Sequence, residues 1–418
     1  MKTILVITYT TSPYQGSEAS VSWNYITRMS LTHKLVVVFA MGGAETEKWV
    51  AENGTPNGNV EFCNIPIPPL TFNGLWDDIK YNWIEYRWHR RIVPVVEELC
   101  RRHNVDYIHY LNPIGFRIAG HCWRIGKPYV WGPVSGVHTR PLQLWRAQSA
   151  RGIFNTLFRI VAHNAALWFS PSVRRSLKHT DVLLTATRTS QRQFEKIHGI
   201  HSVYLPENGI TEMYTDQPVK VAEGEKIRMI WAGAIIDRKA LILPLMGLAK
   251  LSETERAKIE LHVVGDGDMR AKMERYCREN GLDKCVIFHG KVERGEVLKL
   301  FAQSHLHIIS SLCEATTTVL LEAMASGVPT ITLDHCGMAG VVCEKCGIKI
   351  PIGSMRQVTD DFAHNFRRVI DNPSIIEILS KGVLESSKDF MWDNRISVFD
   401  KAFEDAAKIR AAKRKKNE

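Results

Sequence analysis

Short apolar runs alternate with helical stretches along the second half of the chain. The apolar runs lie at residues 227–233, 259–264, 286–289, 306–310 and 329–333. Helical stretches separate them at about 239–251, 269–280, 296–303 and 317–326, and several end at a glycine, as helix C-termini commonly do. Strand–helix alternation of this regularity predicts a doubly wound parallel sheet.

The first half of the chain shows the same alternation less regularly. Strands are predicted at 4–8, 35–40, 107–111, 129–131 and 181–185. Runs that are apolar throughout indicate parallel strands with helices on both faces. We therefore predict two α/β domains in tandem, at residues 1–206 and 207–390, followed by a helical, basic segment at 391–418.

The loop after the predicted strand at 306–310 carries Glu314 and a run of threonines. Two tandem domains of this class usually bind ligand between them, at the carboxyl ends of their strands. Thr317 and Thr318 supply N–H groups at a helix start, which stabilise a phosphate or another anion. Glu322, two turns further on, could accept hydrogen bonds from sugar or ribose hydroxyls. Taken alone, the two acids would be a capping carboxylate and an exposed helix glutamate.

Arg238 and Lys239 occupy the loop after the predicted strand at 227–233. Two cations there could bind an anionic group, and stabilisation of developing charge is usually the largest catalytic contribution. Cations are mildly disfavoured at a helix start. The functional interpretation is therefore favoured over a solvated pair.

Several segments together resemble one enzyme family. EATTTVLLEAMASGVP, which begins at Glu314, resembles the E-x7-E signature of retaining glycosyltransferases, most of all glycosyltransferase family 4. WAGAIIDRKAL resembles the family's donor-binding strand and loop, and LHVVGDGDM and FHGKVERGEVLKLFAQSHLHIISS agree in order and spacing. FMWDNRISVFDKAF resembles its closing helix. The resemblance covers residues 227–406 well and residues 1–206 loosely.

This resemblance implies a GT-B fold, in which two Rossmann-like doubly wound domains face a central cleft and the C-terminal helix crosses back onto the first. It implies a retaining glycosyltransferase that moves a sugar from a nucleotide-sugar donor to a glycan or lipid-linked acceptor, in cell-surface polysaccharide synthesis. Arg238 and Lys239 would hold the diphosphate, Glu314 would orient the donor sugar, and Glu322 would contact the ribose. The other donor-binding positions would be Gly16, Gly233, Thr317 and Thr318.

The position of an active-site histidine is left open. Family members often carry Asp-x-x-His-x-His in the first domain, and this chain has Asp106, His109 and then Leu111. His109 is the candidate and His138 is its alternative. The leucine keeps open a non-catalytic subunit that anchors a glycan synthase. A sugar-nucleotide epimerase or a phosphorylase on the same fold is a further alternative.

Two patterns resemble metal sites without predicting one. The acids within residues 266–268 mimic a metal-binding Asp-x-Asp, but they lie in a strand-to-helix turn where an aspartate more simply caps the helix. Cys336, Cys343 and Cys346, with His335, could form part of a zinc site, yet no second Cys pair follows. We expect no metal and no cofactor beyond the nucleotide-sugar.

The distribution of basic residues predicts a further, anionic binding partner. The net charge is +10, and residues 107–180 hold basic and aromatic residues but no Asp or Glu. Such a segment could form an interfacial helix on anionic lipid or bind a nucleic-acid strand. It could also form a core helix whose arginines reach solvent. We favour a membrane surface and expect no nucleic acid. The nine cysteines and the absence of a recognisable signal peptide predict a cytoplasmic protein, peripheral at the inner face of the membrane.

Overall fold

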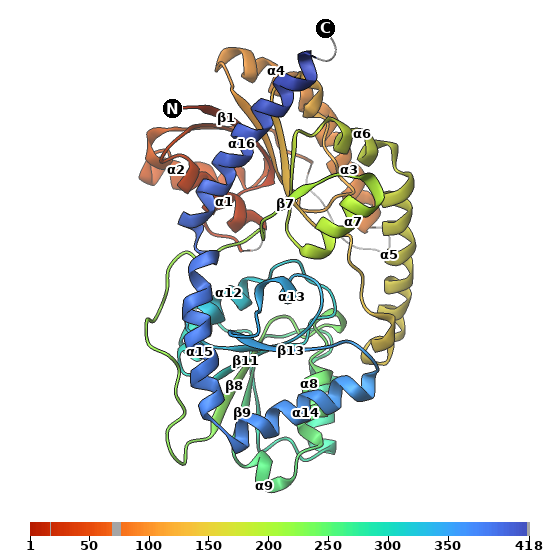
Figure 1. Cartoon of the computed structure of the whole chain (residues 1–418), viewed down its shortest axis with the longest axis vertical. Helices are drawn as coiled ribbons and strands as arrows, with labels where there is room; N and C mark the ends of the chain where they lie inside the picture. The colour runs from red at the N-terminus through yellow and green to blue at the C-terminus, as the bar shows by residue number, and fades with distance from the viewer. Residues whose placement is uncertain (17, 69–76, 416–418) are drawn as a thin grey trace. The chain divides into compact units, whose positions relative to one another are not determined.

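The computed structural model describes residues 1–16, 18–68 and 77–415, and the chain divides into two compact units (Figure 1). Unit 1 contains residues 1–137 and 162–208 together with the chain from Trp392 onward. Unit 2 contains residues 138–161 and 209–391. Each unit is built around a parallel sheet of its own.

The sheet of unit 1 has the strand order β3-β2-β1-β4-β5-β6-β7, and all its described pairs are parallel. The five strands predicted in this half of the chain are confirmed, and β3 and β7 are additional. The strands are β1 (Thr3–Thr10), β2 (Lys34–Met41), β3 (Val60–Asn64), β4 (Tyr107–Asn112), β5 (Tyr129–Val134), β6 (Val182–Thr185) and β7 (Ser202–Tyr204).

Helices cover both faces of this sheet. They include α1 (Glu18–Met29), α2 (Gly43–Asn53), α3 (Asp77–Arg91), α4 (Val93–Arg102), α6 (Pro171–His179), α7 (Arg188–His198) and α16 (Trp392–Lys415), with the 3-10 turns η1 (Pro56–Gly58) and η2 (Cys122–Ile125). Helix α5 (Ala150–Phe169) contains residues of both units.

Alternate residues of β1 face two different hydrophobic cores. Ile4 and Val6 pack with residues of α1 and α16, whereas Leu5 and Ile7 face a core that contains Trp88 of α3. Successive side chains of a strand point to opposite faces of the sheet. A strand covered by helices on both faces must therefore be apolar throughout, as the sequence of β1 is.

Helix α16 packs onto unit 1, so the closing helix predicted from the sequence is confirmed. Phe399 and Phe403 enter the core that contains Ile4 and Val6. The buried guanidinium of Arg395 donates hydrogen bonds to the carbonyl oxygens of Asn208, at 2.9 Å, and Pro206.

The sheet of unit 2 has the strand order β10-β9-β8-β11-β12-β13, again with parallel pairs. The five strands predicted here are confirmed, and β13 is additional. The strands are β8 (Ile227–Ala232), β9 (Ile259–Val264), β10 (Val286–Gly290), β11 (Leu306–Ile309), β12 (Thr330–Leu333) and β13 (Gly347–Ile350).

The helical segments of unit 2 surround this sheet (Figure 1). They include α8 (Ile242–Ala249), α9 (Glu253–Arg256), α10 (Arg270–Glu279), α11 (Arg294–Ala302), α12 (Thr318–Ala325), α13 (Met338–Val341), α14 (Met355–Asp371) and α15 (Ser374–Ser386). The 3-10 turns are η3 (Leu142–Ala147), η4 (Asp237–Lys239) and η5 (Ser387–Phe390).

Residues 138–161 lie with unit 2, although the sequence places them far ahead of its other residues. Leu144 and Ala147 of η3 belong to the main hydrophobic core of that unit. The backbone N–H of Ser149 donates to Oδ1 of Asp237 at 3.0 Å, and its hydroxyl donates to the same carboxylate. These contacts connect the start of α5 to the loop after β8.

Candidate functional site

The strand order of unit 2 reverses direction between β8 and β11. Helical connections leave toward opposite sides at such a point, and α/β proteins bind ligands at the carboxyl ends of the strands there. The loop after β8 carries Arg238 and Lys239 in η4, and the loop after β11 carries Glu314. The residues predicted as the chemical centre thus come from the two loops at this point.

The structure brings these three side chains together. The Nζ atom of Lys239 lies 2.7 Å from Oε1 of Glu314, and Nη1 of Arg238 contacts the same oxygen. Nη1 of Arg238 also donates to the carbonyl oxygen of Cys313 at 3.1 Å. The side chains of Lys239 and Glu314 are only 13% and 14% exposed. One carboxylate oxygen therefore lies between two cations in a largely enclosed position.

Backbone hydrogen bonds hold the two loops against each other. The N–H of Leu312 donates to the carbonyl oxygen of Arg238 at 2.8 Å. The hydroxyl of Ser310 donates to the carbonyl oxygen of Lys239 at 2.8 Å and accepts from Nε1 of Trp231 at 3.0 Å. Residues fixed in this way present their side chains in one geometry, which is what a binding or catalytic site requires.

Gly233, at the end of β8, lies directly beside Lys239. Its φ of 148° and the neighbouring Gly265 allow two strand ends to approach closely, since a Cβ on Gly265 would lie 1.9 Å from the carbonyl oxygen of Gly233. A Cβ on Gly233 itself would lie 3.6 Å from Cε of Lys239. The predicted donor-binding glycine therefore lies next to the lysine.

Helix α12 begins close after Glu314 in the chain. Thr317 is its N-cap residue, with an extended backbone, and its side chain makes no capping hydrogen bond to the described part of the helix. Thr318 is the first helical residue. The start of a helix carries partial positive charge and stabilises anions. The two threonines thus lie where the sequence placed them.

Glu322 lies on α12 and is 9% exposed. Its Oε1 is 3.2 Å from Nη2 of Arg294 on α11. Burial raises the pKa of Glu322 above its usual value, and the charge of Arg294 opposes that change. A carboxylate held by a largely exposed arginine can exchange that partner for a hydroxyl group, so contact with a ribose stays a prediction.

His109 lies in β4, in the core of unit 1, and is fully buried. Its Nε2 donates to the carbonyl oxygen of Gly132 at 2.7 Å, and its Nδ1 is 2.8 Å from the hydroxyl of Tyr25. Burial lowers the pKa of His109 to about 4, and the bond to Gly132 opposes this. With both ring nitrogens engaged, His109 is placed to support the core and not to contact a substrate.

His138 lies in unit 2, beside the Glu314 loop. Its carbonyl oxygen accepts a weak hydrogen bond from Sγ of Cys313 at 3.7 Å. The Nδ1 atom of its imidazole is buried without a hydrogen-bond partner in the described part of the chain. Of the two candidate histidines, His138 is therefore the one next to the predicted catalytic residues.

Gly16 lies between β1 and α1 in unit 1. A Cβ at this position would meet no atom of the described residues within 4 Å. Its φ is not among those in the left-handed region. The described chain therefore does not itself require a glycine here, and contact with the donor phosphates stays a prediction.

Sequence reasoning did not single out Asp237 or Arg140. Asp237 fixes the start of α5 through Ser149. Arg140 donates to Oε1 of Gln148 at 2.9 Å, and its buried Nε has no partner among the described residues. Burial lowers the pKa of Arg140. An aspartate before a helical turn signals only local capping, so its partner 88 residues away could not be inferred.

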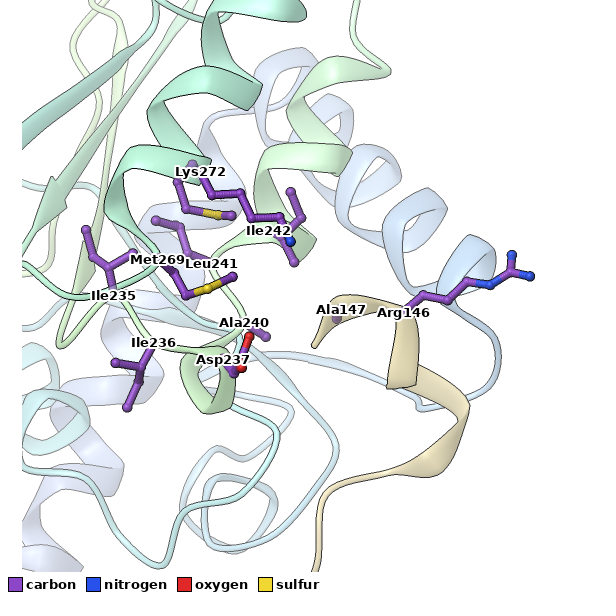
Figure 2. Close-up of a pocket in the computed structure, with 11 residues that line it drawn as sticks. Arg146, Ala147, Ile235, Ile236, Asp237, Ala240, Leu241, Ile242, Met269 and Lys272 are labelled. Atoms are coloured by element: carbon purple, nitrogen blue, oxygen red, sulfur yellow. The ribbon is translucent and has the colours of Figure 1, made fainter. Parts of the chain in front are cut away.

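A small cavity of about 30 Å³ lies beside η4 (Figure 2). Ile235, Asp237, Ala240 and Met269 are among its lining residues, and the side chain of Arg146 extends away from the others. This volume has room for a few water molecules at most. The cavity is therefore too small to be a nucleotide pocket.

Residues 214–381 match the family model described as glycosyl transferases group 1. That stretch includes β8 to β13 and the cluster of Arg238, Lys239 and Glu314. This part of the chain therefore resembles the group 1 glycosyl transferases. The lipopolysaccharide glucosyltransferase WaaG of Escherichia coli is 29% identical over 157 residues, which are 37% of this chain and 38% of WaaG. The chain matches its curated relatives over less than half of their length.

Solved structures extend the likeness in fold to the whole chain. The lipopolysaccharide outer core galactosyltransferase WaaB, in its apo form, gives a TM-score of 0.66 at 16% identity and covers 96% of this chain and 98% of its own. HepE of Anabaena in complex with UDP gives a TM-score of 0.62 at 15% identity. The match covers 96% of this chain and 99% of HepE. These likenesses confirm the predicted GT-B fold with two Rossmann-like domains.

Proposed function

We propose that this protein is a retaining glycosyltransferase that moves a sugar from a nucleotide-sugar donor to a glycan or lipid-linked acceptor. The observation that carries the proposal is the convergence of Arg238, Lys239 and Glu314 where the strand order of unit 2 reverses. Their place inside the stretch that matches the group 1 glycosyl transferase model supports it. The retaining course rests on the resemblance of residues 314–329 to the E-x7-E signature.

The three side chains suggest a division of roles. Both cations contact Oε1 of Glu314. A diphosphate carries more negative charge than one carboxylate, so donor binding shifts Arg238 and Lys239 toward the diphosphate. Glu314 is then placed to accept hydrogen bonds from hydroxyl groups of the donor sugar. As the glycosidic bond of the donor breaks, charge grows on the departing diphosphate, and the two cations stabilise it.

We propose a uridine nucleotide as the donor class and a hexose as the transferred sugar. The structure of HepE contains UDP, and WaaG is a glucosyltransferase of lipopolysaccharide. We propose a cell-surface glycan as the acceptor because WaaG acts on lipopolysaccharide. Two cations already meet the charge of the leaving group, so nucleotide binding should not require added Mg²⁺ or Mn²⁺.

We also propose that the protein acts at the inner face of a membrane, through helix α5. Phe154, Leu157, Phe158 and Val161 are spaced as one helical stripe, and each is between 49% and 69% exposed. Arg151 and Arg159 are exposed on the same helix. An exposed apolar stripe with neighbouring arginines fits the headgroup region of anionic lipid. No helix in the described part of the chain is long and apolar enough to cross a bilayer.

A thermal-shift panel tests the donor proposal. UDP, GDP, ADP and CMP are compared on the wild type, on Lys239→Ala and on Lys258→Ala, whose lysine is exposed and outside the site. A ligand at about 100 times its dissociation constant stabilises the native state by about 2.7 kcal/mol. We expect the largest shift with UDP, unchanged by added Mg²⁺, abolished in Lys239→Ala and kept in Lys258→Ala. Equal shifts in all three proteins would contradict the assignment of Lys239.

Measuring turnover together with the thermal shift distinguishes donor binding from the chemical step. The substrate is the nucleotide-sugar whose nucleotide gives the largest thermal shift. With this substrate, Glu314→Gln should retain the thermal shift but show a kcat about 10²- to 10³-fold lower than the wild type. Removing one electrostatic contact to a transition state usually has an effect of this size. Release of nucleoside diphosphate is the readout. Wild-type turnover in both Glu314→Gln and Lys239→Ala would rule out this site as the catalytic centre.

A further inference from the structure

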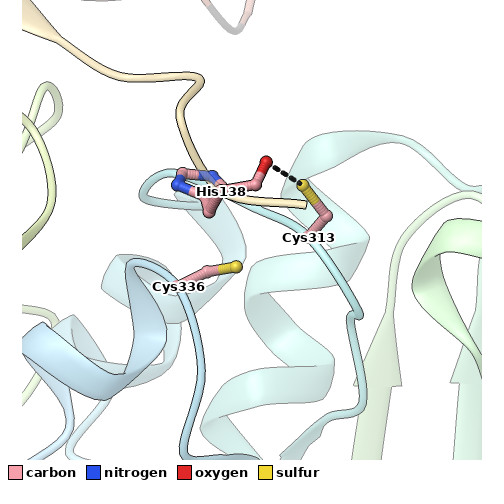
Figure 3. A group of neighbouring side chains, drawn as sticks. All are labelled: His138, Cys313 and Cys336. Atoms are coloured by element: carbon pink, nitrogen blue, oxygen red, sulfur yellow. Dashed lines mark hydrogen bonds between the residues drawn. The ribbon is translucent and has the colours of Figure 1, made fainter. Parts of the chain in front are cut away.

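Three potential metal ligands from distant parts of the sequence meet in unit 2 (Figure 3). Cys313 lies in the loop after β11, Cys336 in the loop after β12, and His138 in the segment that precedes η3. One ligand atom of each residue lies within 4.8 Å of the others. The loops after β11 and β12 are adjacent because these strands pair in the sheet.

The cluster is buried and incompletely satisfied. His138 is 7% exposed and Cys336 is 4% exposed. The Nδ1 atom of His138 has no hydrogen-bond partner among the described residues. A buried imidazole nitrogen without a partner is costly and uncommon, so it points to a ligand.

We propose that His138, Cys313 and Cys336 bind one Zn²⁺ ion. Thiolate sulfur and imidazole nitrogen are the preferred ligands of zinc, which binds them tetrahedrally at about 2.3 Å and about 2.0–2.1 Å. Ligand atoms of such a site lie roughly 3.5–3.8 Å apart. Side-chain rotations that close the cluster by about 1 Å would reach this geometry, with a water molecule in the fourth position.

The neighbouring candidates are occupied elsewhere. Nε2 of His335 lies 3.0 Å from the carbonyl oxygen of Thr139. Sγ of Cys343 lies 2.7 Å from Sγ of Cys346 and 3.4 Å from the hydroxyl of Ser386. The structure therefore groups Cys336 with Cys313 and His138, and not with the Cys-x-x-Cys pair suggested by sequence spacing.

The proposed ion would lie next to the cluster of Arg238, Lys239 and Glu314. Cys313 directly precedes Glu314, and its carbonyl oxygen accepts a hydrogen bond from Arg238. A metal here would tie the loops after β11 and β12 to residues 138–161. It would fix the position of Glu314 without contacting the donor sugar. This positioning effect rests on the role proposed above for Glu314, whereas zinc binding itself does not.

Metal analysis of the purified full chain tests the site. We expect one zinc per chain after dialysis, with Cys313→Ser, Cys336→Ser and His138→Gln each lowering the affinity by about tenfold or more. The matched control is the double variant Cys343→Ser/Cys346→Ser, which should retain the full zinc content. Co²⁺ in place of zinc should give a thiolate-to-metal charge-transfer band that weakens when either Cys313 or Cys336 is replaced.

A measurement on the wild type keeps the test valid if the variants fold poorly. Bound zinc should protect Cys313 and Cys336 from alkylation, and a chelator should remove this protection without changing the labelling of Cys343. The proposal is overturned if the wild type binds no stoichiometric zinc, if the Cys343/Cys346 variant alone loses it, or if peptide mapping finds a Cys313–Cys336 disulfide in place of the metal.

Discussion

The imidazole rings of His89, His109 and His307 are buried in the cores of the two units. Burial lowers the pKa of His109 to about 4, and those of His89 and His307 to about 3. An unfolded chain binds a proton on each of these residues near pH 6.5, whereas the folded chain does not. The unfolded state thus takes up more protons below neutrality, and each ring makes the fold less stable as the pH falls.

His109→Gln tests this effect for one ring. The wild type should lose up to roughly 3 kcal/mol of stability from His109 between pH 6.5 and pH 4. The glutamine does not titrate, so the difference in unfolding free energy between the two proteins should shrink over that interval. Urea unfolding at several pH values measures this difference. A constant difference would show that His109 is already charged in the fold. Comparing the two proteins cancels the opposite trend from Glu85, whose pKa burial raises to about 8.

Local sequence identified the charged residues of the candidate site because each follows a buried strand. Arg238, Lys239 and Glu314 were predicted in this way, and the fold brings them into contact. The cluster of His138 with Cys313 and Cys336 was not predicted. Its members are separated by up to about 200 residues, and no local pattern shows that a segment of the first half packs against unit 2.

Helix α5 shows how much an element can depend on what surrounds it. Phe154, Leu157, Phe158 and Val161 follow the spacing of a core-facing helix, yet the structure leaves them exposed. Two of the interpretations open from the sequence were a helix buried in the core and a helix on a lipid surface. Exposure of the apolar stripe favours the second.

Phe154→Ser/Phe158→Ser tests the lipid surface. Burial of one phenylalanine side chain contributes about 1.5–3 kcal/mol, so the double variant should bind phosphatidylglycerol vesicles about tenfold or more weakly. Flotation of protein with the vesicles is the measurement. Ile378→Ser, which removes an exposed apolar side chain from α15, is the matched control and should bind as the wild type does. Binding that does not depend on Phe154 and Phe158 would exclude α5 as the contact.

The strands of unit 2 were easier to predict than the elements around them. The five predicted strands are rich in apolar residues, and this pattern leaves a clear signal in the sequence. β13 (Gly347–Ile350) is missed because its glycine and lysine interrupt the apolar pattern. Residues 138–161 were assigned to the first domain because the packing of Leu144 against unit 2 depends on tertiary contacts.

At the scale of the whole molecule, unit 1 is assembled from three separate stretches of chain. Its last stretch is α16, which is anchored by the buried Arg395. The guanidinium lies 4.8 Å from the ring centroid of Trp392 and donates to two backbone carbonyls of the chain that leads out of β7. Burial lowers the pKa of Arg395 to about 10, and Glu207 and Tyr204 oppose the change. The arginine therefore stays charged at neutral pH.

Arg395→Leu should destabilise unit 1 and leave unit 2 folded. The change removes a buried charge, leaves the carbonyl oxygens of Pro206 and Asn208 without their donor, and should cost about 3–5 kcal/mol. Hydrogen exchange should then quicken in β1 and β4 but not in β8 and β11, and the thermal shift with UDP should survive. Lys401→Leu, at an exposed position on the same helix, should change neither the hydrogen exchange of these strands nor the thermal shift with UDP. Equal acceleration in both units would mean that they unfold together, and that α16 stabilises the whole chain and not unit 1 alone.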